Sequence, residues 1–290
     1  MSLRVSLTCS LALLFGLAIP ARADFYATDW SSTGAISNLY DLNPTTGAAT
    51  LVGSTGVRLL IGITADTNGT LYSVSENDSG PSNLYTINPT TGLATLVGSL
   101  GVATAEGDLA INPATGTLYV ANALSDQLLT VNKTTGLATV VGSFGAPGRD
   151  VSGLLFSGGT LYGLALNDAR PDTLVTINLT TGAATTVGST GSNFGVIAAL
   201  SQDPSTGTAY IAGPATTFGN DNQLWTINLA TGAAVLSGPI TGITSSISGL
   251  TPIPKPASAA PEPASIILAG IGLAGLGLVS LRSRARNMGK

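Results

Sequence analysis

One segment recurs five times along the chain at a nearly constant spacing. Its second copy, LYTINPTTGLATLVGS, begins at Leu84, and the others begin at Leu39, Leu128, Leu174 and Leu224. Successive copies start 45, 44, 46 and 50 residues apart, and in each the first Leu precedes the last Gly by fourteen residues. A period of this size is typical of repeat architectures in which each unit is one supersecondary structure.

Each copy predicts a β-hairpin. In the second copy, residues 85–87 (YTI) and 95–97 (TLV) are short runs of β-branched and aromatic residues, as strands prefer. Residues 88–92 (NPTTG) separate them, and Asn, Pro and Gly each favour a turn for a different physical reason. Because the hairpin length never varies, the register of the two strands is fixed. We name these strands C and D.

Two further strands precede each hairpin. Strand B is predicted at residues 24–26, 70–72, 117–119, 160–162 and 208–210, and an apolar strand A precedes four of these at residues 61–64, 109–111, 154–156 and 197–200. Four short antiparallel strands in about 45 residues are typical of one β-propeller blade.

The strand count predicts how the ring closes. There are five strands B, C and D, but only four strands A precede a strand B. The segment Ile247-Ser248-Gly249-Leu250 matches residues 151–154 and can supply the missing strand beside Phe25-Tyr26. Such closure removes exposed sheet edges. Residues 24–253 are therefore predicted to form an all-β, five-bladed propeller, with an open β-solenoid or a string of small sandwiches as the alternative.

Both ends of the chain carry targeting signals. Residues 1–23 combine a basic start, an apolar run and Ala21-Arg22-Ala23, which predicts a signal peptide cleaved between Ala23 and Asp24. A Pro/Ala linker follows the propeller at 254–264. Residues 265–281 are predicted to form a transmembrane helix, although its length of roughly 25 Å is slightly short of a ~30 Å hydrocarbon core, and a basic tail at 282–290 orients it. A plain tail anchor is one interpretation.

A second interpretation is more specific. The motif Pro261-Glu262-Pro263, the Gly-rich apolar helix and the cluster Arg282, Arg284 and Arg286 together resemble the PEP-CTERM sorting signal of Gram-negative bacteria that make exopolysaccharide. The resemblance implies an exported protein, a membrane-embedded exosortase as its processing partner, and residence in the cell envelope or extracellular matrix, with transient or stable membrane anchoring.

Composition removes several functional classes. Only 9% of residues are charged, which argues against a nucleic-acid partner. The chain has no histidine, and Cys9 lies in the predicted signal peptide, so Ser-His-Asp triads and zinc sites built from His or Cys are excluded. A pair of carboxylates acting as in a glycosidase stays open. We expect no enzymatic activity and no cofactor.

The variable B–C loops point to the functional face. In a propeller these loops share one face with the D–A loops, and loops that vary on a rigid scaffold often carry function. We call this the loop face. Its acidic residues are weak candidates for Ca²⁺, although solvated charges are the preferred interpretation: Glu76, Asp78, Asp126, Asp168, Asp172 and Asp221. Four others are expected at the channel mouth as candidates for a small polar or sugar ligand: Arg58, Glu106, Arg149 and Asn193.

The preferred hypothesis is a secreted, non-enzymatic surface or matrix protein that binds or has a structural role in exopolysaccharide or biofilm. The alternatives are a surface enzyme acting on polysaccharide and a lectin-like module that binds Ca²⁺ or sugar. Another surface protein is a further candidate partner. The repeats also resemble bacterial propellers with an L-Y-x-[IV]-N-x-x-T-G pattern, which implies a fold but no activity.

Overall fold

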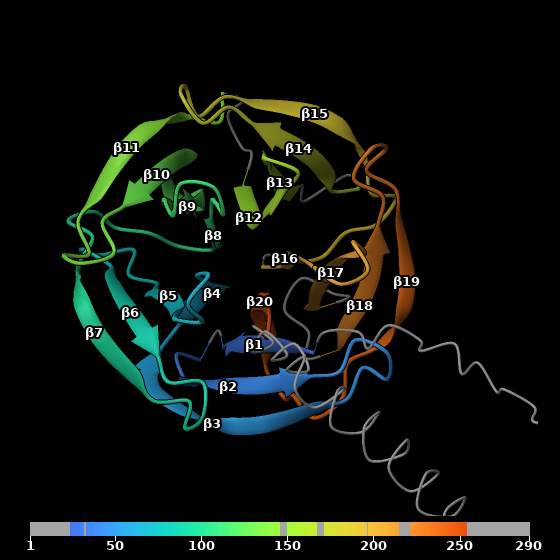
Figure 1. Ribbon diagram of the computed structural model, residues 1–290, viewed down its shortest axis with the longest axis horizontal. Coiled ribbons are helices and arrows are strands. Elements are labelled where there is room, and N and C mark those ends of the chain that lie inside the picture. The colour runs from blue at the N-terminus through green and yellow to red at the C-terminus, as the bar shows by residue number, and fades with distance from the viewer. Residues whose placement is uncertain are drawn as a thin grey trace, which may run out of the picture. The chain divides into compact units, whose positions relative to one another are not determined.

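The computed structural model describes residues 24–31, 33–145, 150–166, 171–195, 197–214 and 221–253. In this part of the chain, five four-stranded antiparallel sheets stand around a common axis as the blades of a propeller (Figure 1). The predicted fold is confirmed.

The strands of each blade run in order from the axis to the rim, and we number the blades from the N-terminus. Blade 1 comprises β20 (Ser246–Pro252), β1 (Phe25–Trp30), β2 (Ile36–Leu42) and β3 (Ala49–Arg58). Blade 2 comprises β4 (Leu60–Ala65), β5 (Leu71–Ser75), β6 (Asn83–Ile87) and β7 (Ala94–Ser99). Blade 3 comprises β8 (Leu109–Ile111), β9 (Leu118–Asn122), β10 (Gln127–Val131) and β11 (Ala138–Ser143), with the 3-10 turn η1 (Ala123–Ser125) between β9 and β10.

The last two blades repeat the pattern. Blade 4 comprises β12 (Asp150–Ser157), β13 (Thr160–Leu166), β14 (Thr173–Ile177) and β15 (Ala184–Ser189). Blade 5 comprises β16 (Ala199–Gln202), β17 (Ala209–Pro214), β18 (Asn222–Ile227) and β19 (Ala234–Pro239). The largest difference from the predicted strand boundaries is in β3, which runs six residues beyond the predicted strand D. Its end pairs again with the start of β2, where Arg58 is opposite Ile36.

The C-terminal strand closes the ring as predicted. Strand β20 lies antiparallel to β1 as the innermost strand of blade 1. In this pair Tyr26 is opposite Thr251 and Gly249 is opposite Thr28. Each of the five innermost strands also contacts both of its inner neighbours, so the inner ring is continuous.

The hairpin turns follow the predicted chemistry in all five copies. In blade 2 the Asn88 side-chain oxygen accepts hydrogen bonds from the backbone N–H of Thr90 (2.8 Å) and Thr91 (3.1 Å), which forms an Asx turn. The equivalent Asn makes the same pair of bonds in each other copy. Gly92 then adopts a φ of 77°, which explains the glycine at this position.

The last glycine of the first four repeats has a second role that the pattern alone did not show, whereas Gly238 of the fifth repeat has no neighbour within 4 Å of an added Cβ. Leu84 is opposite Gly98 across the hairpin, at a β-bulge that recurs in every blade. The backbone of Gly98 also touches the C–D turn of the next blade, and a Cβ atom there would overlap the Thr135 carbonyl oxygen. Gly53, Gly142 and Gly188 make the same contact with the following turn. These glycines therefore allow neighbouring blades to approach closely.

Backbone hydrogen bonds join the blades at the same places. The N–H of Ala138 in blade 3 donates to the Leu100 carbonyl after blade 2, at 3.0 Å. Ala184 and Ala234 repeat this bond at the next two junctions. Ala49 makes the corresponding bond to Thr241 at 2.8 Å, which joins blade 1 to blade 5. Ring closure thus also uses a backbone hydrogen bond, but its acceptor lies one residue later in the repeat than at the internal junctions.

The apolar core lies between the blades and toward the axis. Innermost strands such as β4 are almost wholly buried, and the strand-B tyrosines are buried or half-buried between blades. On the outermost strands several leucines are exposed, for example Leu51 and Leu96, each at 58%. Among the strands that the structure describes, none lies outside strand D, and the side chains of strand D are exposed or half-buried in patterns such as that of β7.

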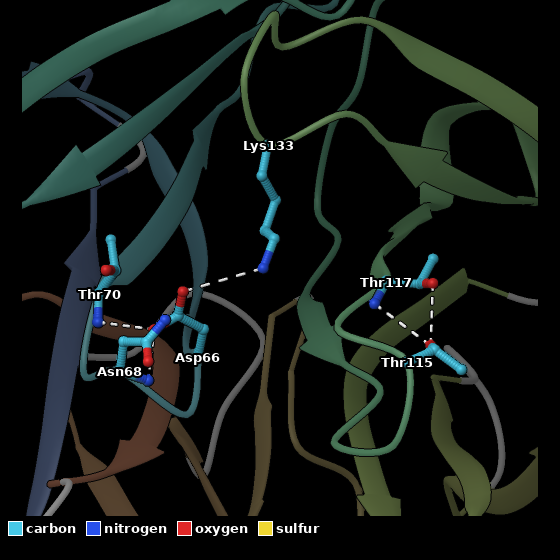
Figure 2. Close-up of polar contacts among 6 residues, drawn as sticks. All are labelled: Asp66, Asn68, Thr70, Thr115, Thr117 and Lys133. Atoms are coloured by element: carbon cyan, nitrogen blue, oxygen red, sulfur yellow. Dashed lines mark hydrogen bonds and ion pairs between the residues drawn. The ribbon is translucent and has the colours of Figure 1, made fainter.

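A small electrostatic contact links blades 2 and 3 on the face that carries the A–B and C–D turns. Figure 2 shows Lys133, from the C–D turn of blade 3, pointing toward Asp66 in the A–B turn of blade 2, with 3.8 Å between Nζ and Oδ2. Asp66 Oδ1 also accepts the backbone N–H of Asn68 (3.0 Å) and Thr70 (2.9 Å). Lys133 Nζ lies 5.6 Å from the centre of the Tyr72 ring.

Replacement of this lysine is expected to have a small effect. Lys133→Met keeps the aliphatic stem but removes the charge, and exposed ion pairs contribute about 0–1 kcal/mol. We expect the free energy of unfolding to fall by less than about 1 kcal/mol. The difference from the wild type should shrink in 1 M salt, which screens charges beyond roughly 3 Å. Urea denaturation of both proteins at low and high salt measures this difference. A larger loss of unfolding free energy that salt does not change would contradict an electrostatic role for Lys133.

The predicted signal peptide, linker, apolar helix and basic tail all lie outside the described residues. Within residues 24–253 as described, no helix is long and apolar enough to cross a membrane.

Candidate functional site

The residues expected at the channel mouth do not share one environment. Arg58 ends β3, is exposed, and donates from Nη1 to the Gly34 carbonyl at 2.9 Å. Glu106 is half-buried with a left-handed backbone (φ 52°), and Asn193 is exposed just before Phe194. Arg149 lies outside the described residues.

The acidic candidates for Ca²⁺ are also dispersed. Asp78 and Asp221 are exposed, and Asp126 ends the 3-10 turn η1. Asp172 is buried, where its Oδ2 accepts the Phe194 N–H at 2.7 Å and so holds the D–A loop of blade 4. Asp168 lies outside the described residues. Among the described residues, no group of three or more Asp, Glu, His or Cys side chains could hold a metal ion.

One carboxylate occupies the axis of the propeller. Asp108 is 1% exposed, and its two oxygens accept the backbone N–H groups of Leu109 (2.8 Å) and Leu154 (2.9 Å), from β8 and β12. The Leu200 backbone in β16 donates to the same carboxyl group, and Gly62 of β4 lies directly beside Oδ1. Burial raises the pKa of Asp108 well above its usual value, although the three backbone donors lower it. Asp108 therefore ties together inner strands of several blades.

A second buried carboxylate organises the loop face of blade 1. Asp29, near the end of β1, is 3% exposed. Its oxygens accept hydrogen bonds from the backbone N–H and side-chain amide of Asn38 (2.5 and 3.2 Å), from the Tyr40 hydroxyl (3.0 Å) and from the Ser245 hydroxyl (2.5 Å). Ser245 is 216 residues away in sequence, in the D–A loop that leads into β20. The network therefore joins the two ends of the propeller.

A pocket of about 230 Å³ lies beside this network. We call it the seam pocket. It is lined by the end of β1, the start of β2 and the loop before β20: Asp29, Trp30, Ser31, Ala35, Ile36, Ser37, Asn38, Thr244 and Ser245. It opens on the predicted loop face, and the blade 1 loop that begins at Trp30 provides most of its wall.

Trp30 connects the seam pocket to blade 2. Its indole Nε1–H donates to Oε2 of Glu76 at 2.7 Å, in the B–C loop of blade 2. Burial raises the pKa of Glu76. The hydrogen bond from the indole lowers this pKa, and the nearby charge of Asp78 raises it. Glu76 thus holds the Trp30 ring in place.

The Tyr40 hydroxyl offers a direct test of the Asp29 network. Burial, followed by the charge and hydrogen bond of Asp29, raises the pKa of Tyr40 to about 12. Tyr40→Phe should lower the free energy of unfolding by roughly 1–2 kcal/mol at neutral pH, since a hydrogen bond to a charged group is lost. Because the folded pKa is raised, this contribution is complete below pH 10 and is lost as pH rises through 12. Denaturation of the wild type and Tyr40→Phe at pH 7, 9 and 11 tests this. A difference in the free energy of unfolding that widened with pH would contradict a hydrogen bond from the Tyr40 hydroxyl to Asp29.

Sequence reasoning found the right loop but missed most of the pocket. The pocket lies in the variable B–C loop of blade 1, on the predicted loop face, but none of its nine lining residues is among the individual candidates predicted from the sequence. Trp30, Asn38 and Ser245 are ordinary residues in isolation. Their meeting depends on ring closure, which brings residue 245 beside residue 29.

Comparison with solved structures supports the propeller fold alone. The chain is similar to a chain in the crystal structure of a nidogen/laminin complex, with a TM-score of 0.51 and 11% identity, covering 80% of this chain and 98% of that one. It also matches TolB from Acinetobacter baumannii with a TM-score of 0.47 and 12% identity, over 80% of this chain and 58% of that one. A comparison with curated proteins finds no match.

Two family models match the sequence itself. The model of the PEP-CTERM protein-sorting motif matches residues 259–285, which confirms the resemblance of the C-terminal segment. This motif implies an exported protein that is processed by an exosortase from a membrane-anchored precursor and is associated with the envelope of a Gram-negative bacterium. A second model, of a repeat of unknown function (DUF6923), matches residues 66–249, which is more than half of the chain. The chain therefore belongs to the DUF6923 repeat family and carries a PEP-CTERM sorting motif.

Proposed function

We propose that this exported propeller is a non-enzymatic component of the extracellular matrix, where it binds or organises exopolysaccharide through its loop face. The sorting motif supports the location, because it accompanies export to the cell envelope. The closed ring supports the role, because a rigid scaffold holds variable loops in fixed positions.

The non-enzymatic part of the proposal rests on how the protein uses its buried carboxylates, on the loop side and at the axis. Asp29, Asp108 and Asp172 each accept hydrogen bonds from the protein's own backbone or side chains. A glycosidase instead requires two carboxylates about 5–10 Å apart across a substrate cleft. The seam pocket contains a single carboxylate, Asp29, which already accepts four hydrogen bonds.

One observation favours the enzymatic alternative. Glu76 is half-buried with a raised pKa, as a general acid requires, and Asp78 lies two residues away. The indole of Trp30 already occupies one Glu76 oxygen, at 2.7 Å. We therefore assign Glu76 a positioning role for Trp30.

Co-sedimentation with polysaccharide tests the proposal. The exported protein, purified from its host, is incubated with exopolysaccharide from the same host, with and without EDTA. We expect the protein to sediment with the polymer in both conditions and the polymer to keep its size distribution on gel filtration. Absence of co-sedimentation would contradict the binding role, and loss in EDTA alone would instead indicate a Ca²⁺-dependent lectin. Shortening of the polymer that Glu76→Gln abolishes would establish the enzyme.

A further inference from the structure

We propose that the seam pocket binds one neutral sugar unit of a polysaccharide, with Trp30 and Ile36 as its apolar wall and Asn38 and Thr244 among its polar groups. This inference rests on the proposed function and assigns it to one site. It differs from the channel-mouth site expected from the sequence, which would have used Arg58, Glu106, Arg149 and Asn193.

The walls of the pocket are held in place before any ligand arrives. Asp29 accepts hydrogen bonds from Asn38 on one wall and from Ser245 on the other, so a single buried carboxylate fixes both. Trp30 is 8% exposed, and its Nε1–H is bound to Glu76. A site whose side chains are already locked loses little conformational entropy on binding.

The composition of the lining selects the class of ligand. Five of the nine lining residues carry hydroxyl or amide groups, which can both donate and accept hydrogen bonds: Ser31, Ser37, Asn38, Thr244 and Ser245. Trp30 and Ile36 add apolar surface, and Ile36 is 45% exposed. A sugar ring presents hydroxyl groups at its edge and C–H groups on its faces, so it matches both kinds of surface.

Charge argues against the other small ligands. An anion would approach the Asp29 carboxylate, and none of the nine lining residues is basic. A metal cation would find one carboxylate whose oxygens already accept four hydrogen bonds. A neutral ligand meets neither obstacle.

Size limits the ligand to a small unit. A volume of about 230 Å³ is below the roughly 300–1,000 Å³ of pockets that enclose drug-sized molecules. Thr244 is exposed at the mouth, while Ser37 is buried at 1% exposure. A single sugar ring can enter, with the rest of a polymer outside on the loop face.

The two tryptophans of the chain allow binding to be followed at the pocket. Trp225 is buried between blades 4 and 5, where it packs against Phe194 and does not line the seam pocket, so Trp225→Phe leaves Trp30 as the only indole. In this background, the exported protein is titrated with the methyl glycosides of glucose, galactose, mannose and N-acetylglucosamine, and with glucuronate. Trp30 fluorescence and calorimetry report binding.

The matched variants are Thr244→Tyr, which fills the pocket, and Thr241→Tyr, at an exposed threonine of the same loop that does not line it. We expect at least one neutral glycoside to bind and to change Trp30 fluorescence. Thr244→Tyr should weaken this binding at least tenfold, Thr241→Tyr should not change it, and glucuronate should bind at least tenfold more weakly than the glucoside. Ala35→Tyr is a second filling variant, and circular dichroism checks that each variant folds.

The outcomes separate this inference from the proposed function. If the protein co-sediments with polysaccharide but binds none of the glycosides, or if both filling variants bind as tightly as the parent, the seam pocket is not the site and the matrix role stands. Tighter binding of glucuronate than of the glucoside would also overturn the inference. If the protein binds neither polymer nor glycoside, both proposals fail.

Discussion

Gly98→Ala should destabilise the propeller by about 3 kcal/mol, the upper end of the usual cost of overpacking. The added Cβ would overlap the carbonyl oxygen of Thr135 in the next blade. Backbone on both sides makes this overlap hard to relieve, because no side chain can rotate away. The blades would have to separate, which would also stretch the nearby bond from Ala138 to Leu100, now 3.0 Å.

A matched glycine serves as the control. Gly80 lies in the B–C loop of blade 2, and a Cβ there would meet only the end of the Asn77 side chain, at 3.3 Å. We expect Gly80→Ala to change the free energy of unfolding by less than about 1 kcal/mol, as surface substitutions usually do. Guanidinium denaturation of both variants provides the comparison. Equal midpoints for Gly98→Ala and the wild type would show that the blades are not in close backbone contact.

Loss of the axial carboxylate should have a comparable effect. Asp108→Ala would leave the buried N–H groups of Leu109 and Leu154 without their acceptors, at a cost of about 1–3 kcal/mol each. We therefore expect a total loss of about 2–6 kcal/mol. Asp108→Asn keeps one oxygen acceptor and the shape of the side chain, so it should lie between the wild type and Asp108→Ala.

The pH dependence separates the charge of Asp108 from its shape. Because burial raises its folded pKa above the unfolded value of 3.8, the folded state holds the proton more tightly. The contribution of Asp108 to stability is therefore complete below that unfolded pKa and is lost as pH rises through the folded pKa. The gap between the wild type and Asp108→Asn, measured by urea denaturation from pH 4 to pH 8, should shrink as pH rises. A gap that grew with pH would mean that the axial carboxyl is stabilised as an anion.

Local chemistry explains why so much of the fold was predictable. The NPTTG turn at Asn88 carries its own hydrogen bonds, so its residues specify a hairpin without help from the rest of the chain. The unequal number of strands A and B then required a closing strand near Gly249, which the structure confirms. Both inferences depend on short-range pattern and counting.

Contacts between blades were not predictable in the same way. The role of Gly98 depends on its contact with Thr135 of the next blade, and that of Asp108 on its bond to Leu154 of β12. The seam pocket requires Asp29 and Ser245 to meet across almost the whole chain. Exposure of Leu96 at the rim likewise follows from its place on the outermost strand, which composition does not reveal.

A disulfide between β1 and β20 tests ring closure most directly. Tyr26 and Thr251 are opposite each other, and facing residues of an antiparallel pair lie about 4.5–5.5 Å apart between Cα atoms, within the range of a disulfide. Ser248 is three residues away along the strand, or roughly 10 Å, and is the control position. A Cys9→Ser background removes the only native cysteine. We predict that Tyr26→Cys with Thr251→Cys forms an intramolecular disulfide that raises the melting temperature, and that Tyr26→Cys with Ser248→Cys does not. No disulfide in the first pair, or equal disulfide formation in the second, would contradict a ring closed by the C-terminal strand.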